Sequence, residues 1–339
     1  MADVAFPEQQ ELERLVEAGG EWLETRSLGE VESGGRRFPL LCLSLGTRRR
    51  RCPAVGFFGG IHGLERIGTR VVLAFLAGLL ARLPWDGLLR QQLENLRLVF
   101  MPLVNPGGMW AASRSNPQGV DLMRNAPVDS RERPLPFLGG QRLSARLPWF
   151  RGRPEGGMEL ESAALCRVVE EELLTRRFSI ALDCHSGFGL MDRIWFPYAH
   201  TVAPMGRLAE VYALNELFER SYPSHCYLFE PQSHNYLTHG DLWDYLSLRA
   251  QSQHVFLPLT LEMGSWAWVR KSPLQLFSRE GLFNPGPPHR LKRTLRRHLL
   301  WLDFLARAAS SHRGWLPRGV EREARQGAAL ARWYREPAS

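Results

Sequence analysis

The chain has 339 residues, of which 44% are hydrophobic and 23% are charged. This composition supports a sizeable buried core and excludes a disordered chain. The formal net charge is +8, and all but two of the 43 basic residues are arginines. Biased codon usage explains an arginine excess as well as any ligand does, so we expect no nucleic-acid partner.

The cysteines and the apolar segments indicate where the protein resides. Its five cysteines have no paired spacing, which argues against a disulfide framework. Residues 1–13 are acidic and contain no apolar segment of the kind found in signal peptides. The longest uncharged apolar stretch, Val71–Ala81, is far shorter than the roughly 20 residues of a membrane-spanning helix. We therefore expect a soluble, cytoplasmic protein with no membrane partner.

Short apolar runs alternate with helical patterns along the chain. The apolar runs predict strands over 38–45, 54–61, 96–104, 178–184, 194–198, 226–229 and 254–262. The helical patterns predict helices over 67–83, 160–174, 204–220 and 241–249, and from 288 onward. Residues 105–157 are polar and rich in glycine and proline, which is typical of a functional loop.

This alternation predicts one α/β domain over residues 1–339, with a largely parallel, buried sheet. In such sheets, ligands bind beyond the carboxyl ends of the strands. The residues of a candidate site should therefore lie just after predicted strands.

Several strand ends and the loops that follow them carry residues that can bind a metal and activate water. They are His62, Glu65, Arg114, Arg124, His185 and Glu262. Two histidines and a glutamate can hold zinc and leave one coordination position open. The His-x-x-Glu pair is a weak signal alone, but four strand ends that deliver such residues together favour a metal site.

The motifs resemble those of the zinc metallocarboxypeptidase family, which has the carboxypeptidase A-like (funnelin) fold. In order, they are His62–Glu65, Asn105–Gly108, Arg114–Asn125, His185–Ser186 and Thr260–Glu262. The resemblance covers about residues 53–264. It implies a twisted, mixed, largely parallel eight-stranded sheet flanked by helices. We expect residues 1–37 and 285–339 to be helical extensions packed on this domain.

The resemblance also implies a metal centre and a base. His62, Glu65 and His185 would bind one zinc ion per chain. Glu262 would be the general base that takes a proton from the attacking water and passes it to the leaving amine. Asp121 would accept the outer N–H of His62 and fix its tautomer.

By the same resemblance, Arg114 would stabilise the oxyanion of the scissile carbonyl. Arg124 would pair with the terminal carboxylate of the substrate, with Tyr236 and Asn125 as further substrate-binding residues. One position departs from the family pattern. Met123 stands where the family usually has an asparagine that donates to this carboxylate, and methionine cannot donate. Trp243 either narrows the specificity pocket or packs in the core.

The expected function is zinc-dependent hydrolysis of a peptide or amide bond, most simply release of a C-terminal amino acid from a peptide. One alternative is an amide hydrolase acting on acylated amino acids, similar to succinylglutamate desuccinylase and aspartoacylase. Others are trimming of cell-wall peptides or acidic tails, and a binding module without catalysis. The expected partner is a peptide or acyl-amino-acid substrate, and the sequence predicts no oligomeric state.

Overall fold

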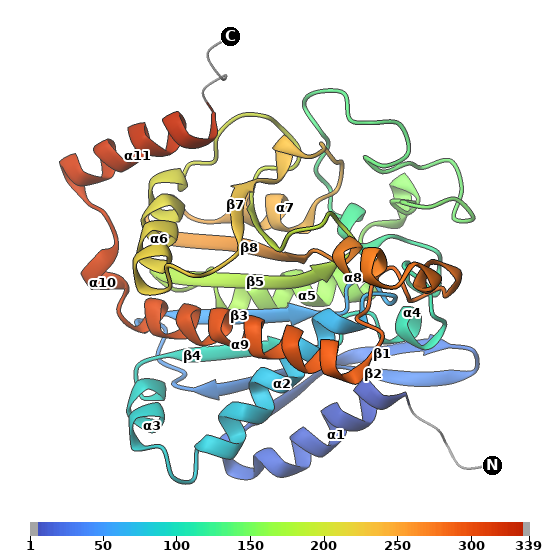
Figure 1. The fold of residues 1–339 in the computed structure, drawn as a ribbon, viewed down its shortest axis with the longest axis horizontal. Coiled ribbons are helices and arrows are strands. Elements are labelled where there is room, and N and C mark those ends of the chain that lie inside the picture. Colours follow the sequence, from blue (N-terminus) through green and yellow to red (C-terminus); the bar gives the residue numbers. More distant parts are fainter. Residues whose placement is uncertain (1–5, 335–339) are drawn as a thin grey trace.

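A computed structural model describes residues 6–334. An eight-stranded mixed sheet crosses the domain in the order β1-β2-β4-β3-β5-β8-β6-β7 (Figure 1). The strands are β1 (Glu24–Ser33), β2 (Arg36–Gly46), β3 (Ala54–Gly59), β4 (Arg97–Met101), β5 (Phe178–Ser186), β6 (Arg193–Phe196), β7 (Leu228–Pro231) and β8 (Val255–Met263).

Helices cover the sheet and close its ends. They are α1 (Pro7–Gly19), α2 (Arg66–Arg82), α3 (Gly87–Leu93), α4 (Pro106–Trp110), α5 (Leu160–Glu172), α6 (Leu208–Ser221), α7 (Leu242–Arg249), α8 (Trp266–Lys271), α9 (Pro288–Ser310), α10 (His312–Trp315) and α11 (Gly319–Trp333). Short 3₁₀ turns lie at Gly20–Trp22, Leu122–Arg124, Pro154–Gly156, Gln232–His234 and Pro273–Phe277.

The centre of the sheet is parallel and its flanks are antiparallel. β4, β3, β5 and β8 run parallel to one another, whereas β2 and β6 pair with them in the opposite direction. Every residue of β3, β5 and β8 is buried. Burial on both faces explains why these strands appear in the sequence as continuous apolar runs rather than as alternating patterns.

Each face of the sheet has its own hydrophobic core. On the face toward the viewer in Figure 1, α1, α2 and α9 pack together, and α2 and α9 bury Val71, Leu76 and Trp301. On the other face, α5 and α7 contribute Leu165 and Leu246. The parallel strands between these layers all end at the same edge of the sheet, so their carboxyl-end residues gather there.

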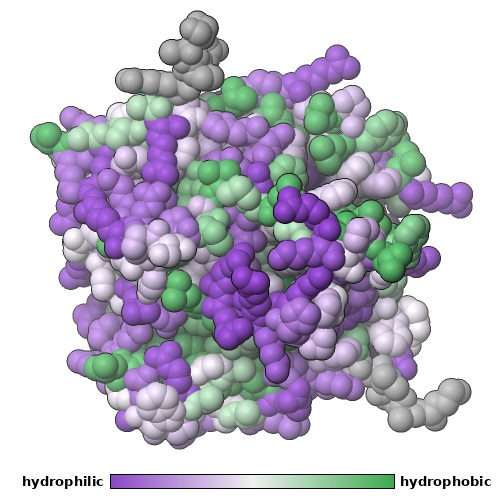
Figure 2. Space-filling view, viewed as in Figure 1, coloured by the Kyte–Doolittle hydropathy of each residue, from purple (hydrophilic) through white to green (hydrophobic). Residues whose placement is uncertain are grey.

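The helix α9 is amphipathic, as its sequence predicts. Leu302 is fully buried, and the leucines at 291, 295 and 299 pack against the core from partly buried positions. Figure 2 shows hydrophilic side chains over α9 on the outer face of the molecule. The apolar stripe of the helix therefore faces the sheet and its arginines face solvent.

The structure corrects part of the predicted organisation. The expected helical extension over 1–37 contains α1, but residues 24–33 form β1, the edge strand of the sheet, and residues 1–5 lie outside the described part. The expected extension over 285–339 is helical from Pro288 to Trp333, with two breaks, and residues 335–339 are not described. The strand expected at 226–229 lies at 228–231.

Within residues 6–334, no single helix is long and apolar enough to cross a membrane. The pair α2 and α3 meets that criterion only when taken together, across a bend of 114°. All five cysteines lie in the described residues, and none of them is in a disulfide.

Candidate active site

The carboxyl ends of three parallel strands bring the predicted residues together. His62 and Glu65 lie in the connection from β3 to α2, and His185 lies near the end of β5. His185 and Glu262 are register partners on the adjacent strands β5 and β8, so both side chains leave the sheet on the same face. The topology thus assembles residues that are 200 positions apart in the chain.

Glycine allows α2 to begin close to the sheet. A Cβ on Gly68 would lie 2.0 Å from the carbonyl oxygen of Cys184, so only glycine fits between α2 and β5. Glu65 stands directly before α2 and His185 directly follows Cys184. The close packing of helix on strand therefore sets the distance between two of the expected metal ligands.

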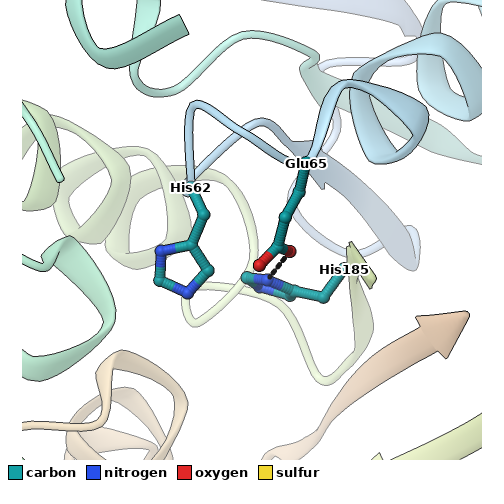
Figure 3. Close-up of side chains that lie close together, drawn as sticks. All are labelled: His62, Glu65 and His185. Atoms are coloured by element: carbon teal, nitrogen blue, oxygen red, sulfur yellow. Dashed lines mark hydrogen bonds and ion pairs between the residues drawn. The ribbon is translucent and has the colours of Figure 1, made fainter. Parts of the chain in front are cut away.

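His62, Glu65 and His185 form a compact, buried cluster (Figure 3). One ligand atom from each residue lies within 4.8 Å of the others. Nδ1 of His185 lies 2.9 Å from Oε2 of Glu65. Two imidazoles and a carboxylate are the donors that zinc uses in sites with an open position.

The electrostatics of the cluster fit a cation. Burial, together with the charge of Arg114, lowers the pKa of His62 to about 3, which keeps its imidazole neutral. Its Nδ1 is buried and has no hydrogen-bond partner among the described residues. Burial opposes ionisation of Glu65, but its electrostatic interactions with His62, His185 and Arg114, together with its hydrogen bond with His185, lower the pKa of Glu65 to about 2. A neutral imidazole with a free nitrogen beside an ionised carboxylate is ready to bind a metal.

His185 is held from behind by a residue that the sequence analysis did not identify. Oδ2 of Asp183 lies 2.6 Å from Nε2 of His185 and accepts a hydrogen bond of 2.8 Å from Nε1 of Trp243. Despite burial, Asp183 and Glu65 raise the pKa of His185 well above its usual value. The Asp-x-His spacing on a strand, which places both side chains on one face, is the signal that could have identified Asp183.

Trp243 is a core residue. Its side chain is buried and contacts the ring of Phe58 edge-on, at 5.2 Å between centroids. It does not line the pocket into which the cluster of His62, Glu65 and His185 opens. Of the two alternatives that the sequence left open for Trp243, core packing is therefore correct. Trp243 also anchors Asp183 through its indole N–H.

Arg114 reaches into the metal cluster. Its guanidinium donates to Oδ2 of Asp121 at 2.9 Å and to Oε1 of Glu65 at 3.2 Å, and it lies 2.7 Å from Nε2 of His62. Asp121 was expected to accept a hydrogen bond from His62. Its Oδ1 is instead 3.7 Å from Nδ1 of His62, too far for a direct bond. The geometry therefore corrects the expectation for Asp121: it accepts directly from Arg114, and its Oδ1 accepts from the backbone N–H of Met123 at 3.1 Å.

The cluster opens into a pocket of about 300 Å³. Arg124 and Tyr236, both expected to bind substrate, line this pocket. Arg124 is 3% exposed, has no carboxylate partner in the described chain, and makes 3.4 Å contacts to the carbonyl oxygens of Met123 and Leu138. Its guanidinium lies 5.9 Å from the ring centroid of Tyr236. A buried, unpaired guanidinium that faces a pocket is a ready partner for an anion.

Glu262 lies in the same pocket. Its Oε1 accepts a hydrogen bond of 3.0 Å from the backbone N–H of Phe188. Burial, together with the negative charge of Glu65, raises the pKa of Glu262 to about 8. A carboxylate whose proton affinity is raised in this way is suited to general acid–base chemistry near neutral pH.

Asn125 does not bind substrate in this geometry. Its Nδ2 donates to the carbonyl oxygen of Arg151 at 3.0 Å, and its Oδ1 accepts from the backbone N–H of Glu159 at 2.6 Å. The side chain is buried and does not line the pocket. The expected substrate-binding role of Asn125 is therefore corrected: it holds together two parts of the long loop.

With this geometry established, the comparisons with known proteins identify the family. The chain belongs to the zinc carboxypeptidase family, whose model matches residues 11–266. A 104-residue segment is 31% identical to carboxypeptidase SOL1 of Arabidopsis thaliana, covering 30% of this chain and 21% of that protein. A 106-residue segment is 28% identical to carboxypeptidase 2 of Trichophyton rubrum, covering 30% of this chain and 19% of that protein. The matched segments thus span about a fifth of the length of these relatives.

Solved structures share the fold. Thrombin-activatable fibrinolysis inhibitor aligns with a TM-score of 0.66 and 19% identity, over 88% of this chain and 72% of its own. Carboxypeptidase A from Helicoverpa armigera aligns with a TM-score of 0.65 and 17% identity, over 88% of this chain and 71% of that structure's chain. The predicted family and fold class are confirmed.

Proposed function

We propose that this protein is a zinc-dependent carboxypeptidase that releases a C-terminal amino acid from a peptide. The observation that carries this proposal is the pocket that joins the His62–Glu65–His185 cluster, the Glu262 carboxylate and the unpaired Arg124. The three cluster residues would hold one zinc ion per chain. When bound, zinc lowers the pKa of a water molecule and polarises a carbonyl oxygen.

Glu262 is the proposed base. Its hydrogen bond from Phe188 orients the carboxylate, and no other hydrogen bond engages it in the described part of the chain. It can therefore accept a proton from the attacking water and deliver it to the leaving amine. Its raised proton affinity, which comes from burial and from Glu65, favours the first of these transfers.

Two arginines would bind different parts of the substrate. Arg114, held by Asp121, would donate to the carbonyl oxygen as it gains negative charge. Arg124 would bind the terminal carboxylate with its planar, two-pronged group, and Tyr236 would lie against it. A carboxylate bound at Arg124 would direct the last peptide bond, rather than a bond further inside the peptide, toward the metal cluster in the same pocket.

The pocket walls disfavour a positively charged C-terminal side chain. Apolar side chains from several segments line it, among them Leu138, Trp149 and Trp195. Its only carboxylates in the described residues are Glu65 and Glu262, both assigned to the chemistry. A lysine or arginine side chain would find no free carboxylate there and would lose hydration without compensation.

Met123 supports one second candidate, an amide hydrolase acting on acylated amino acids. Met123 is buried and lines the pocket beside Arg124, where it can donate no hydrogen bond to a carboxylate. If Met123 instead packs against a substrate group, the pocket is built for something other than a simple terminal carboxylate, and this candidate gains support.

The two candidates can be separated by turnover assays. Purified protein would be given a panel of peptides with free and amidated C-termini, and a panel of N-acylated amino acids, each with and without a chelator. We expect zinc-dependent release of single amino acids from free-carboxylate peptides. Turnover confined to the acylated amino acids would support the second candidate.

A variant then tests the assigned base. Glu262→Gln should abolish turnover and leave the zinc content unchanged, because the amide keeps the shape but cannot accept the proton. The exposed Glu94→Gln variant is the control and should behave as wild type. Zinc lost from Glu262→Gln, or activity retained, would show that Glu262 is a ligand or that the base is another residue.

A further inference from the structure

A second cavity, of about 510 Å³, lies at the end of the sheet opposite the catalytic pocket. Its lining residues lie at or near the amino ends of β3, β5 and β8 and in or after α10. Figure 1 shows α10 at that end of the strands. Four arginines line it: Arg51 before β3, Arg177 before β5, and Arg313 and Arg318 after α9. No feature of the proposed peptidase reaction uses this place.

The four guanidinium groups are not neutralised by the protein. Within residues 6–334 none of them has an ion pair or a side-chain hydrogen bond, and no aspartate or glutamate lines the cavity. Many other arginines of this chain are paired, as Arg97 is with Glu24 and Arg322 with Glu210. All four side chains are exposed at this hollow, and four positive charges with no carboxylate among them attract an anion.

Both walls of the cavity are held in place. On one side Arg176, 2% exposed, donates to the carbonyl oxygens of Arg49 and Cys52 at 2.9 and 3.0 Å and so fixes the loop that carries Arg51. On the other side the ring of His312 stacks on Phe178 with centroids 4.8 Å apart. The arginines therefore extend from rigid segments, which reduces the entropy lost when they bind a ligand.

His312 adds evidence of a positive field. Burial, together with the charges of Arg313 and Arg318, lowers the pKa of His312, although its Nδ1 donates to the carbonyl oxygen of Ala309. The arginines keep their charge at every physiological pH. The cavity is thus strongly cationic near neutral pH without any contribution from the histidine.

We propose that this cavity binds a small molecule that bears two or more linked phosphate groups. Guanidinium groups bind phosphate oxygens in pairs, and several of them together select a ligand with several charges over a single anion. The volume lies in the range of small-molecule sites. The Phe178–His312 stack and Leu316 form an apolar part of the wall, against which the rest of such a molecule can pack.

Titration calorimetry with the full chain tests this proposal, with inorganic tripolyphosphate as the probe in buffer of about 0.15 M salt, where long-range attraction is screened. We expect saturable binding with one site per chain. The double variant Arg177→Gln/Arg313→Gln should raise the Kd at least about tenfold, since each lost guanidinium removes charge-assisted hydrogen bonds. Hydrolysis of a peptide with uncharged side chains and a free C-terminus should not change, because the catalytic pocket lies at the other end of the strands.

Arg293→Gln/Arg296→Gln is the matched control. It removes the same charge from exposed arginines of α9 that also have no ion pair in the described chain. An equal loss of affinity in both double variants would show general attraction to a basic protein and would overturn the proposal. Binding of a single-stranded oligonucleotide without binding of tripolyphosphate would also overturn it, in favour of a nucleic-acid surface.

A single added charge tests the same cavity if the double variant does not fold. Gln253 is exposed on the cavity rim. Gln253→Glu places a carboxylate among the arginines without removing any of them, and it should weaken tripolyphosphate binding by a similar factor. Unchanged affinity in this variant would place the bound anion elsewhere.

Discussion

The indole N–H of Trp243 donates a hydrogen bond of 2.8 Å to Oδ2 of Asp183, the oxygen that also lies 2.6 Å from Nε2 of His185. Through this chain of contacts the helix α7 orients an expected metal ligand on β5. A carboxylate behind a histidine ligand fixes the ring and raises its basicity, and its loss commonly weakens metal binding by about 10–100-fold.

Trp243→Phe should therefore weaken zinc binding about tenfold. Phenylalanine keeps the contact with Phe58 but cannot donate to Asp183. Competition with a chromophoric chelator would measure the zinc affinity. The control is Trp333→Phe, which removes a similar N–H bond, of 2.9 Å to the carbonyl oxygen of Phe229, far from the site. Equal zinc affinity in both variants would show that Trp243 only fills the core.

Met123 beside Arg124 leads to a second prediction. Met123→Asn should raise kcat/KM on ordinary peptides by about threefold to tenfold, because a neutral amide donor contributes about 1 kcal/mol to carboxylate binding. Arg124→Ala should cost far more than this gain, since it removes the charged partner. Steady-state kinetics on a short peptide would measure both.

The exposed Met191, which does not line the catalytic pocket, supplies the control variant Met191→Asn. If Met123→Asn lowers activity on the best substrate, the methionine packs against a substrate group, and the acyl-amino-acid candidate gains support. No change in either direction would contradict a role for this position in carboxylate binding.

The sequence was sufficient to predict where the site lies because the topology leaves little choice. Parallel strands buried on both faces appear as long apolar runs, and the polar residues that follow them must meet at one edge of the sheet. His62, His185 and Glu262 all follow or end such runs, so their approximate convergence could be predicted without coordinates.

Other features depend on contacts that no local pattern reveals. β1 is an edge strand with exposed or half-exposed residues along most of its length, so it lacks the apolar run that marks the central strands. Trp243 meets Asp183 across 60 positions of the chain. Asn125 is adjacent in sequence to Arg124, but the 3₁₀ turn at Leu122–Arg124 sends it toward Arg151 and Glu159 rather than into the pocket.

The close approach of α2 to β5 leads to a third prediction. Gly68→Ala should lower the free energy of unfolding by about 1–3 kcal/mol, because its Cβ would lie 2.0 Å from the carbonyl oxygen of Cys184. It should also weaken zinc binding, since moving α2 away separates Glu65 from His185. Urea unfolding and a zinc titration would measure the two effects.

A second glycine of the same helix provides the control. A Cβ on Gly78 has no atom within 4 Å, so Gly78→Ala should stabilise the protein by up to about 1 kcal/mol through higher helix propensity. If Gly68→Ala proved as harmless as Gly78→Ala, the contact between α2 and β5 would not determine the ligand spacing.

The last prediction concerns stability against pH. His298 is 1% exposed, and its Nδ1 lies 2.8 Å from the hydroxyl of Tyr227. Burial, helped by Arg297 and opposed by Asp192, lowers the pKa of His298 to about 4, whereas an unfolded histidine titrates near 6.5. Between these two values the unfolded chain binds a proton that the folded chain does not, so acid favours unfolding.

His298 should therefore contribute fully to stability above about pH 6.5 and lose that contribution as the pH falls toward 4, at about 1.4 kcal/mol per pH unit. Urea unfolding at pH 7 and pH 5 would measure the loss. In His298→Gln, whose amide can either accept from or donate to the hydroxyl of Tyr227, the loss between these pH values should be smaller by about 2 kcal/mol. The exposed His289→Gln variant should lose as much as wild type. If His298→Gln lost as much free energy of unfolding between pH 7 and pH 5 as the wild type does, other groups would cause the acid sensitivity. The variant differs from the wild type only in lacking the proton that His298 takes up on unfolding.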